Sequence, residues 1–302
     1  MPNNNQKNKN HAIKMSDKYL FLERIGSGSF GEVYIAQINK GQNKGHQIAA
    51  KIENNNRNSK LLYEYKTYEY LRKNGFRIGI PMIYDFVENE SYNMMFMQLL
   101  GPSLEDLFNK HNRTFNFGTI AQLAKQLITL MQTLHTAELI HRDIKPNNFL
   151  IGINDPYTVY IMDFGLSKRF IKNGIHMSFR DGKSLVGTAR YASLNVHRGY
   201  EPSRRDDLES IGYMLVYFFV GKLPWQGLLK KPNENHIEVI GNCKMITPLE
   251  ELCNGIPKCF YDYLKYCRQL EFEEQPDYDY LRKIFKDECV RMSIESYLEW
   301  CV

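Results

Sequence analysis

The stretch Leu139–Leu150, which reads LIHRDIKPNNFL, combines the residue types that a group transfer to an alcohol requires. Asp143 stands five residues before Asn148, and Lys145 lies between them. A carboxylate such as that of Asp143 can accept the proton of a hydroxyl nucleophile. The amide carbonyl of an asparagine is an oxygen ligand of the kind that Mg²⁺ prefers. The spacing therefore predicts that one short loop carries both a general base and a metal ligand.

A second carboxylate follows the short apolar strand expected at Thr158–Met162. It belongs to Asp163, in the tripeptide Asp-Phe-Gly, and it lies twenty residues after Asp143. A strand, a turn and a second strand between the two aspartates would let both carboxylates face one cleft. We expect Asp163 to bind a Mg²⁺ ion that bridges the phosphates of a nucleotide, with Asn148 completing the metal shell. Taken alone, the tripeptide is also compatible with an ordinary turn.

A glycine cluster near the start of the chain is suited to holding phosphates. The residues from Tyr19 to Ile38 alternate apolar and polar side chains on both sides of this cluster, which predicts a strand, a turn and a second strand. Glycines let the backbone approach phosphates and direct N–H groups at them. A dinucleotide-binding site would need a helix directly after the glycines, and Val33 begins a strand-like run instead. The cluster consists of Gly26, Ser27, Gly28, Ser29, Phe30 and Gly31.

A lysine lies inside the next predicted strand, Gln47–Glu53. Lys51 has apolar neighbours there, and a buried ammonium without a partner is costly. Glu64 follows thirteen residues later in a stretch with helical character, so we predict a Lys51–Glu64 ion pair that directs the ammonium at nucleotide phosphates. Glu69 is the weaker alternative partner. Two unconnected surface charges remain the simpler interpretation of this lysine taken alone.

Two further strands and a helix are expected around a boundary between two parts of the chain. The strands are predicted at Pro81–Glu88 and Tyr92–Leu99, and Ser103 is placed to cap the helix that follows Gly101 and Pro102. The backbone of Gln98, Leu99 and Leu100 would be available to an adenine edge, with Met97 behind it. An amphipathic helix predicted at Gly118–Thr136 would support the Asp143 loop.

The composition is that of an ordinary globular protein. The chain has 302 residues, 43% hydrophobic and 24% charged, and a net charge of +5 that by itself indicates no nucleic-acid partner. The longest apolar run, Ile211–Val220, is too short to span a bilayer, and no secretory signal is visible. We therefore expect a soluble, intracellular protein, with residues 1–15 as a disordered leader. All six cysteines lie in the last sixty residues without zinc-site spacing, and we expect reduced core thiols.

With these parts in this order, residues 19–302 resemble a eukaryotic protein kinase. Lys145 and the pair Gly187-Thr188 are similar to the serine/threonine class. Ser193-Leu194-Asn195 stands where most kinases have Ala-Pro-Glu, and this difference is itself typical of the casein kinase 1 family. The segments that resemble this family are Leu99–Phe108, Gly187–Asn195, Ser203–Phe218, Leu223–Leu228 and Pro276–Phe285.

The resemblance implies an α+β, bilobal protein-kinase fold with ATP between the lobes. The β-rich N-terminal lobe would span residues 16–98, and a larger α-helical part with the hinge would span 99–302. Asp143 would act as the base, Lys145 would stabilise the transferring γ-phosphoryl group, and Asn148 and Asp163 would hold Mg²⁺. The residues expected at ATP are Ile25, Gly26, Ser27, Gly28, Ser29, Phe30, Gly31, Val33, Ala49, Lys51, Glu64, Met97, Gln98, Leu99, Leu100 and Leu150.

The same resemblance implies acidic or phosphorylated protein substrates. Arg190 matches one anion-contacting position of the family, and Arg142 with Lys183 matches a second. After Trp225-Gln226-Gly227 the chain departs from the family, because Asn233, Glu234 and His236 stand where basic residues are expected. Lys230 and Lys231 offer compensation from a shifted position. We therefore expect weaker dependence on primed substrates than is typical of the family, while a merely solvated face remains the alternative.

Further expectations concern the surroundings of the site. By similarity, Asp207 would begin the buried helix Asp207–Val220 and anchor the catalytic-loop backbone, while Asp206 would be structural. We expect a monomer, with no nucleic-acid or membrane partner, in the cytoplasm or the nucleus, and active without prior activation. A catalytically silent pseudokinase scaffold is the alternative, although no catalytic residue is missing. A dinucleotide-dependent enzyme is disfavoured because no βαβ unit surrounds the glycines.

Overall fold

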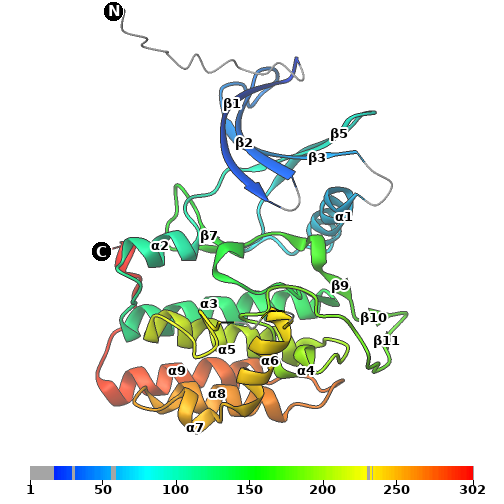
Figure 1. Cartoon of the computed structure of the whole chain (residues 1–302). Helices are drawn as coiled ribbons and strands as arrows, with labels where there is room; N and C mark the ends of the chain where they lie inside the picture. The colour runs from blue at the N-terminus through cyan, green and yellow to red at the C-terminus, as the bar shows by residue number, and fades with distance from the viewer. Residues whose placement is uncertain (1–16, 29–30, 56–58, 230–231, 233, 302) are drawn as a thin grey trace, which may run out of the picture. The chain divides into compact units, whose positions relative to one another are not determined.

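The computed structural model describes residues 17–28, 31–55, 59–229, 232 and 234–301 (Figure 1). Contacts divide the chain into two compact units. The N-terminal unit comprises the described residues up to Lys73 together with Pro81–Leu100. The C-terminal unit comprises Asn74–Ile80 and the described residues from Gly101 onward. The leader expected at residues 1–15, and Lys230, Lys231 and Asn233, lie outside the described residues.

A five-stranded antiparallel sheet forms most of the N-terminal unit, in the order β1-β2-β3-β5-β4. Alternate residues of its strands bury one face around Phe96, whose ring stacks on Tyr19 with the centroids 3.6 Å apart. The strands confirm the five segments predicted from the sequence, although β4 begins at Ile83 and not at Pro81, and β5 ends at Gln98 and not at Leu99. Their bounds are β1 Tyr19–Gly28, β2 Gly31–Ile38, β3 Gln47–Asn54, β4 Ile83–Glu88 and β5 Tyr92–Gln98.

One helix, α1 (Lys60–Lys73), packs on this sheet. Leu61, Tyr68 and Leu71 are buried, so the helix is held by an apolar stripe. Its first turn contains no acidic residue that would complement the helix dipole. The carboxylate that occupies this place is that of Glu53, on β3.

The C-terminal unit is mainly helical. The predicted helix that supports the Asp143 loop is α3 (Phe117–Thr136), and it packs against α5 (Arg204–Val220) and α9 (Tyr278–Met292) (Figure 1). Almost all of α5 is buried, because α3, α8 and α4 all pack against it. The other helices are α2 Leu104–Lys110, α4 Leu194–His197, α6 His236–Ile246, α7 Leu249–Leu252 and α8 Lys258–Gln269, with 3₁₀ turns η1 Pro146–Asn148, η2 Phe164–Leu166 and η3 Glu299–Cys301.

Short antiparallel strand pairs carry the functional loops of this unit. Strand β7 (Phe149–Ile151) pairs with β8 (Val159–Ile161), and β6 (Leu139–Ile140) pairs with β9 (Lys168–Arg169). A third pair joins β10 (Ile171–Lys172) to β11 (Ile175–His176). The predicted combination of an antiparallel, β-rich N-terminal part and a helical C-terminal part is confirmed.

Two expectations about local structure are wrong. Helix α5 begins at Arg204 and not at Asp207, because the Asp206 carboxylate accepts the Ser203 N–H at 2.7 Å and so satisfies the helix start. Cys301 is exposed and Cys243 is only half-buried, so neither is a core thiol, whereas Cys253, Cys259, Cys267 and Cys289 are buried as expected. Within the described ranges, no helix combines the length and the apolar character needed to cross a membrane.

Candidate active site

The loop that follows β6 is held from beneath by a carboxylate on α5. Both oxygens of Asp207 accept backbone N–H groups of this loop, from His141 at 2.7 Å and from Arg142 at 2.9 Å. Arg142 has a left-handed backbone, with φ of 68°, which a residue with a side chain adopts only under constraint. The predicted anchoring of the catalytic-loop backbone by Asp207 is thus present in the structure.

A buried histidine on α3 completes the Asp207 anchor. His135 Nε2 lies 3.1 Å from the Asp207 carboxylate, and its Nδ1 lies 2.8 Å from the Tyr278 hydroxyl. Burial lowers the pKa of His135 despite the neighbouring carboxylate, which favours a neutral ring that donates to Asp207 and accepts from Tyr278. Burial alone would raise the pKa of Asp207, but the His135 contact and the backbone N–H of Arg142 outweigh it and lower this pKa. Asp207 is therefore a permanent anion under the loop.

The carboxylate of Asp143 is oriented from three sides. Lys145 Nζ donates to Oδ2 at 2.6 Å, and the Thr188 hydroxyl donates to Oδ1 at 2.7 Å. Asn148 Nδ2 donates to the backbone carbonyl of Asp143 at 2.8 Å and to Oδ2 of its carboxylate at 3.4 Å. The Thr188 contact depends on Gly187, whose φ is +90° and where a Cβ atom would lie 2.2 Å from the Arg142 carbonyl oxygen. Asp143 itself is only 4% exposed, so its orientation is set by these contacts and not by solvent.

The hairpin of β7 and β8 brings the two predicted metal ligands to the same end. Phe149 and Ile161 form the last residue pair of this hairpin, and beyond it the Met162 N–H donates to the Asn148 carbonyl at 2.8 Å. Asn148 directly precedes β7 and Asp163 directly follows Met162, so both predicted ligands lie just beyond this pair. Asp163 has a left-handed backbone, with φ of 65° and ψ of 71°, a strain that is characteristic of functional positions.

The donor set at this hairpin end fits a hard cation. Asn148 uses its Nδ2 toward Asp143, which leaves its amide oxygen as the ligand atom, and Asp163 supplies a carboxylate. Among the described residues no group of three or more His, Cys, Asp or Glu is placed to hold a metal ion. The amide oxygen of Asn148 and the carboxylate of Asp163 suit an ion such as Mg²⁺, which takes its other ligands from phosphates and water.

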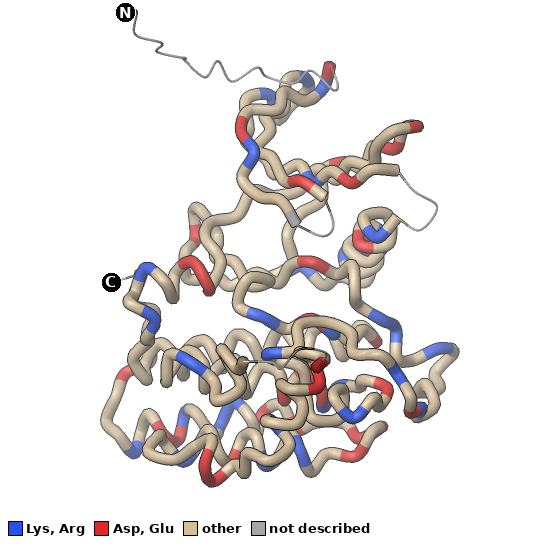
Figure 2. Tube along the Cα trace, in the orientation of Figure 1, with Lys and Arg blue, Asp and Glu red and all other residues tan. Residues whose placement is uncertain are grey.

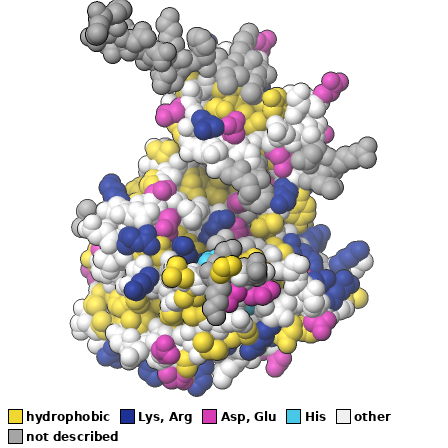
Figure 3. Space-filling model, in the orientation of Figure 1, with side chains coloured by type: hydrophobic (Ala, Val, Ile, Leu, Met, Phe, Trp, Pro, Cys, Tyr) yellow, Lys and Arg dark blue, Asp and Glu magenta, His cyan; other side chains and the backbone are white. Residues whose placement is uncertain are grey.

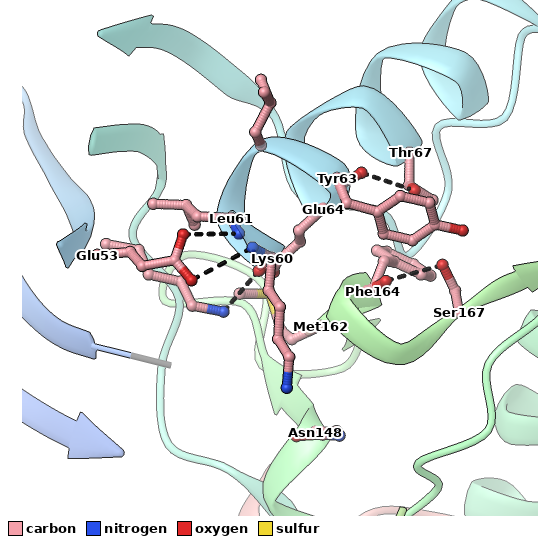
Figure 4. Close-up of polar contacts among 12 residues, drawn as sticks. Glu53, Lys60, Leu61, Tyr63, Glu64, Thr67, Asn148, Met162, Phe164 and Ser167 are labelled. Atoms are coloured by element: carbon pink, nitrogen blue, oxygen red, sulfur yellow. Dashed lines mark hydrogen bonds and ion pairs between the residues drawn. The ribbon is translucent and has the colours of Figure 1, made fainter. Parts of the chain in front are cut away.

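The turn after Asp163 engages a predicted anion-binding residue. Within it, the Ser167 hydroxyl donates to the Phe164 carbonyl at 2.8 Å (Figure 4). Arg142 reaches the same turn, because its Nε donates to the Leu166 carbonyl at 2.7 Å. The guanidinium of Arg142 therefore has a structural role in joining the catalytic loop to this turn, whatever anion it also contacts.

In the N-terminal unit, the predicted ion pair between Lys51 and Glu64 is confirmed. Lys51 Nζ lies 2.6 Å from Glu64 Oε2, with the glutamate side chain 2% exposed. The alternative partner, Glu69, lies 3.5 Å from Lys73 on the surface of α1. The pair links β3 to α1 and fixes the direction of the Lys51 side chain.

Glu53 joins β3 to the start of α1 at a second point. Its carboxylate accepts the N–H groups of Leu61 at 3.2 Å and Lys60 at 3.3 Å, and the Ser59 hydroxyl at 2.6 Å (Figure 4). The Ser59 hydroxyl in turn accepts the Leu62 N–H at 3.0 Å, so Glu53 and Ser59 together cap the start of α1. Sequence reasoning missed Glu53, although its place two residues after Lys51 puts both side chains on one face of the strand.

The other residues expected at ATP are distributed over both units. In the N-terminal unit Ala49 pairs with Met97 across β3 and β5, and both are buried, whereas Ile25 is 49% exposed. Gly31 has φ of +118°, and a Cβ atom there would lie 1.9 Å from the Ile52 carbonyl oxygen. Gly26, Ser27, Gly28 and Val33 lie in β1 or β2, Gln98 ends β5, Leu99 and Leu100 follow it, Leu150 lies in β7 of the C-terminal unit, and Ser29 and Phe30 lie outside the described residues.

The expected substrate-anion residues of the C-terminal unit lie in different surroundings. Lys183 lies 3.9 Å from Glu201, which also accepts a 2.7 Å hydrogen bond from Lys168. Sequence reasoning missed Lys168, which lies on a part of the chain around β9 and β10 that is rich in basic residues (Figure 2). In the space-filling view, which has the same orientation, lysine and arginine side chains also gather over this part of the chain (Figure 3). The guanidinium of Arg190 lies over the rings of Tyr191 and Tyr217.

Comparison with known families agrees with this geometry. The model of the protein kinase domain matches residues 19–282. The chain therefore belongs to the protein kinase domain family, whose members are phosphotransferases that use ATP and a divalent metal ion.

Proposed function

We propose that this protein is an active serine/threonine kinase of the casein kinase 1 type. It would transfer the γ-phosphoryl group of ATP, bound with Mg²⁺, to serine or threonine hydroxyls of acidic or already phosphorylated proteins. The observation that carries the proposal is the Asp143 carboxylate, which is oriented by Lys145 at 2.6 Å and by Thr188 at 2.7 Å. A pseudokinase scaffold would have no need to retain this arrangement.

The role of Asp143 follows from its position on an anchored loop. The carboxylate orients the acceptor hydroxyl and takes its proton as the bond to phosphorus forms. Lys145 contributes positive charge next to it and would stabilise the charge on the transferring group. A metal ion held by Asn148 and Asp163 would supply charge neutralisation at the phosphates.

The N-terminal unit contributes a fixed cation. The Lys51–Glu64 pair holds an ammonium whose ordinary role in this family is to contact the α- and β-phosphates of ATP. The glycines of β1 and β2 would present backbone N–H groups to the same phosphates. These residues position the nucleotide and take no part in proton transfer.

Support for the serine/threonine and casein kinase 1 assignments comes from sequence motifs. Lys145, Thr188 and the Ser193-Leu194-Asn195 segment resemble that family. Recognition of acidic or phosphorylated substrates is supported by Arg190 and by the basic region that includes Lys168 and Lys183. We further propose that the protein acts as a monomer, in the cytoplasm or the nucleus, without nucleic-acid or membrane partners.

The decisive experiment is phosphate transfer from ATP to two matched serine peptides, one with a phosphoserine upstream and one without. We expect transfer by the wild-type protein and none by Asp163→Asn, which retains the shape of the side chain but loses the metal-binding charge. Absence of transfer by the wild type to either peptide, with ATP still bound, would favour the scaffold. The ratio between the peptides tests the family assignment, because a preference for the primed peptide is expected.

Two further measurements test the substrate patch and regulation. Glu234→Lys combined with His236→Lys is expected to raise the rate on the primed peptide, because it restores basic residues at positions where the family has them. An unchanged rate would remove these residues from the substrate site. Activity is expected to survive phosphatase treatment, and its loss would show that prior phosphorylation is needed.

A further inference from the structure

Lys244, on α6, is a lysine with no exposed surface, a rare state for this residue type. Its ammonium donates three hydrogen bonds to backbone carbonyls of a single short segment. The acceptors are Ala192 at 2.6 Å, Ala189 at 3.0 Å and Arg190 at 3.2 Å. Three N–H donors thus meet three acceptors, which is the complete hydrogen-bonding capacity of an ammonium.

The surroundings of Lys244 partly offset the cost of burying its charge. Its Nζ lies 4.8 Å from the ring centroids of both Tyr213 and Trp225, close enough for cation–π attraction. Burial lowers the pKa of Lys244 to about 7, while the negative charge of Glu209 opposes this and Arg268 adds to it. The same ammonium helps to lower the pKa of the neighbouring His197 to about 4, after burial as the main cause.

The segment that Lys244 holds carries residues that the proposed reaction uses. Thr188, which donates to Asp143, directly precedes Ala189. The backbone carbonyl of Arg190 accepts a second hydrogen bond, from Trp225 Nε1 at 2.7 Å, and that of Ala189 lies 3.0 Å from His197 Nε2. The backbone of this segment is therefore fixed from α6, α4 and the Trp225 loop at once.

Close packing of α6 on α4 brings Lys244 within reach of these carbonyls. Gly241 lies one helical turn before Lys244, and a Cβ atom there would lie 2.8 Å from Nδ1 of His197. Such a contact is too short for a methyl group, so a side chain at this position would move α6 or His197. The position of the Lys244 ammonium therefore depends on the glycine.

We propose that Lys244 is a positioning residue for protein-substrate binding, which acts by fixing the backbone of Ala189–Ala192 and, through it, Arg190 and Thr188. The proposal rests on the kinase activity proposed above. In the part of the chain that the structure describes, the hydrogen bonds of Lys244 go to Ala189, Arg190 and Ala192 and none goes to Asp143, so its influence is expected on the peptide and not on ATP. A residue with a purely structural role would lower the apparent kcat through the folded fraction and would leave both KM values unchanged.

Lys244→Met tests this with a side chain of similar length that lacks the donors and the charge. We expect the KM for the serine peptide to rise at least about tenfold, the effect of losing one hydrogen bond from a charged donor, with the KM for ATP unchanged within about twofold. Lys286→Met, on the exposed face of α9, is the matched control and is expected to leave both constants unchanged. Wild-type activity, measured in the same assay, separates failure of this proposal from failure of the proposed function.

Two milder variants keep the test decisive if Lys244→Met does not fold. Trp225→Phe removes the second donor to the Arg190 carbonyl and retains the aromatic face, and Gly241→Ala displaces α6 without altering Lys244. Both are expected to raise the peptide KM by a smaller factor in the same direction, again without effect on the ATP KM. Equal changes in both KM values, or no change in the peptide KM of a folded variant, would overturn the proposal.

Discussion

The two units hold their charged functional groups in different ways. In the N-terminal unit, Lys51 is paired with Glu64, thirteen residues away, and Glu53 caps a helix that begins seven residues later. In the C-terminal unit, the loop with Asp143 is anchored by Asp207, 65 to 66 residues away, and oriented by Thr188, 45 residues away. The first arrangement is built from neighbours in sequence, and the second exists only after distant helices have packed.

This difference indicates where each unit is sensitive to substitution. The Asp207 anchor is buried, so a defect in it leaves backbone N–H groups of His141 and Arg142 without this acceptor and affects folding of the whole unit. The contacts of α1 are partly solvated, and a defect there is expected to alter the direction of Lys51 more than the stability of the fold. Four predictions test this contrast.

The largest effect is expected from Asp207→Asn. The two carboxylate oxygens of Asp207 accept hydrogen bonds from the N–H groups of His141 and Arg142 and from His135. An asparagine amide has only one oxygen, and the NH₂ group that replaces the other oxygen would face one of these donors. The free energy of unfolding, measured in urea, is expected to fall by about 3 kcal/mol, and kinase activity is expected to be lost. Asp279→Asn, on the exposed surface of α9, is the control. A loss no larger than that of the control would show that Asp207 is not the anchor of the loop.

A pH effect of similar size is expected from the adjacent Asp206. Burial raises the pKa of its carboxyl to about 6, against the opposing hydrogen bonds from Ser193 and Ser203. The folded state therefore binds this proton more tightly than the unfolded state, and the resulting stability is present below about pH 4 and lost as pH rises toward 6. Relative to Asp206→Asn, the wild type is expected to lose about 3 kcal/mol across this window. A constant difference between the two proteins in urea titrations would contradict the assignment.

Glu53→Gln is expected to have an intermediate effect. The amide retains one acceptor for the N–H groups of Lys60 and Leu61 but loses the negative charge at the helix start. We expect unfolding to become easier by about 1 kcal/mol, as for other helix caps, and the KM for ATP to rise because α1 carries Glu64. Thermal unfolding and ATP titration of the same sample provide both values. An unchanged ATP KM would separate the cap from the Lys51–Glu64 pair.

The smallest effect is expected from Lys73→Gln, which breaks the surface pair with Glu69. The lysine side chain is 74% exposed, so the expected loss is less than about 0.5 kcal/mol, with activity unchanged. A marked loss of activity would reopen the choice of Glu69 as a functional partner.

The sequence was sufficient for features that depend on local pattern. Alternation along Tyr19–Ile38 predicted β1 and β2, and helical spacing in Gly118–Thr136 predicted α3. The Lys51–Glu64 pair was also predicted, because a lysine in an apolar strand needs a nearby carboxylate. The start of α5 was placed too late because the capping role of Asp206 is a property of the folded turn at Ser203.

Other parts of the site left no local mark in the sequence. His135 is one polar residue near the end of an amphipathic helix, and only the packing of α3 on α5 and α9 places it between Asp207 and Tyr278. Lys168 is joined to Lys183 through Glu201, which lies 33 residues after Lys168. Such contacts cannot be read from spacing, because any exposed lysine or histidine would look the same.

By itself, the sequence determined which residues carry the chemistry and which short segments present them, because these follow from residue type and periodicity. The tertiary structure decided what holds them in place. Lys244 shows the physical reason, since its three carbonyl acceptors lie 52 to 55 residues before it in the chain. Only the close packing of α6 on α4 at Gly241 turns an ordinary lysine into a buried cation beneath the segment Ala189–Ala192.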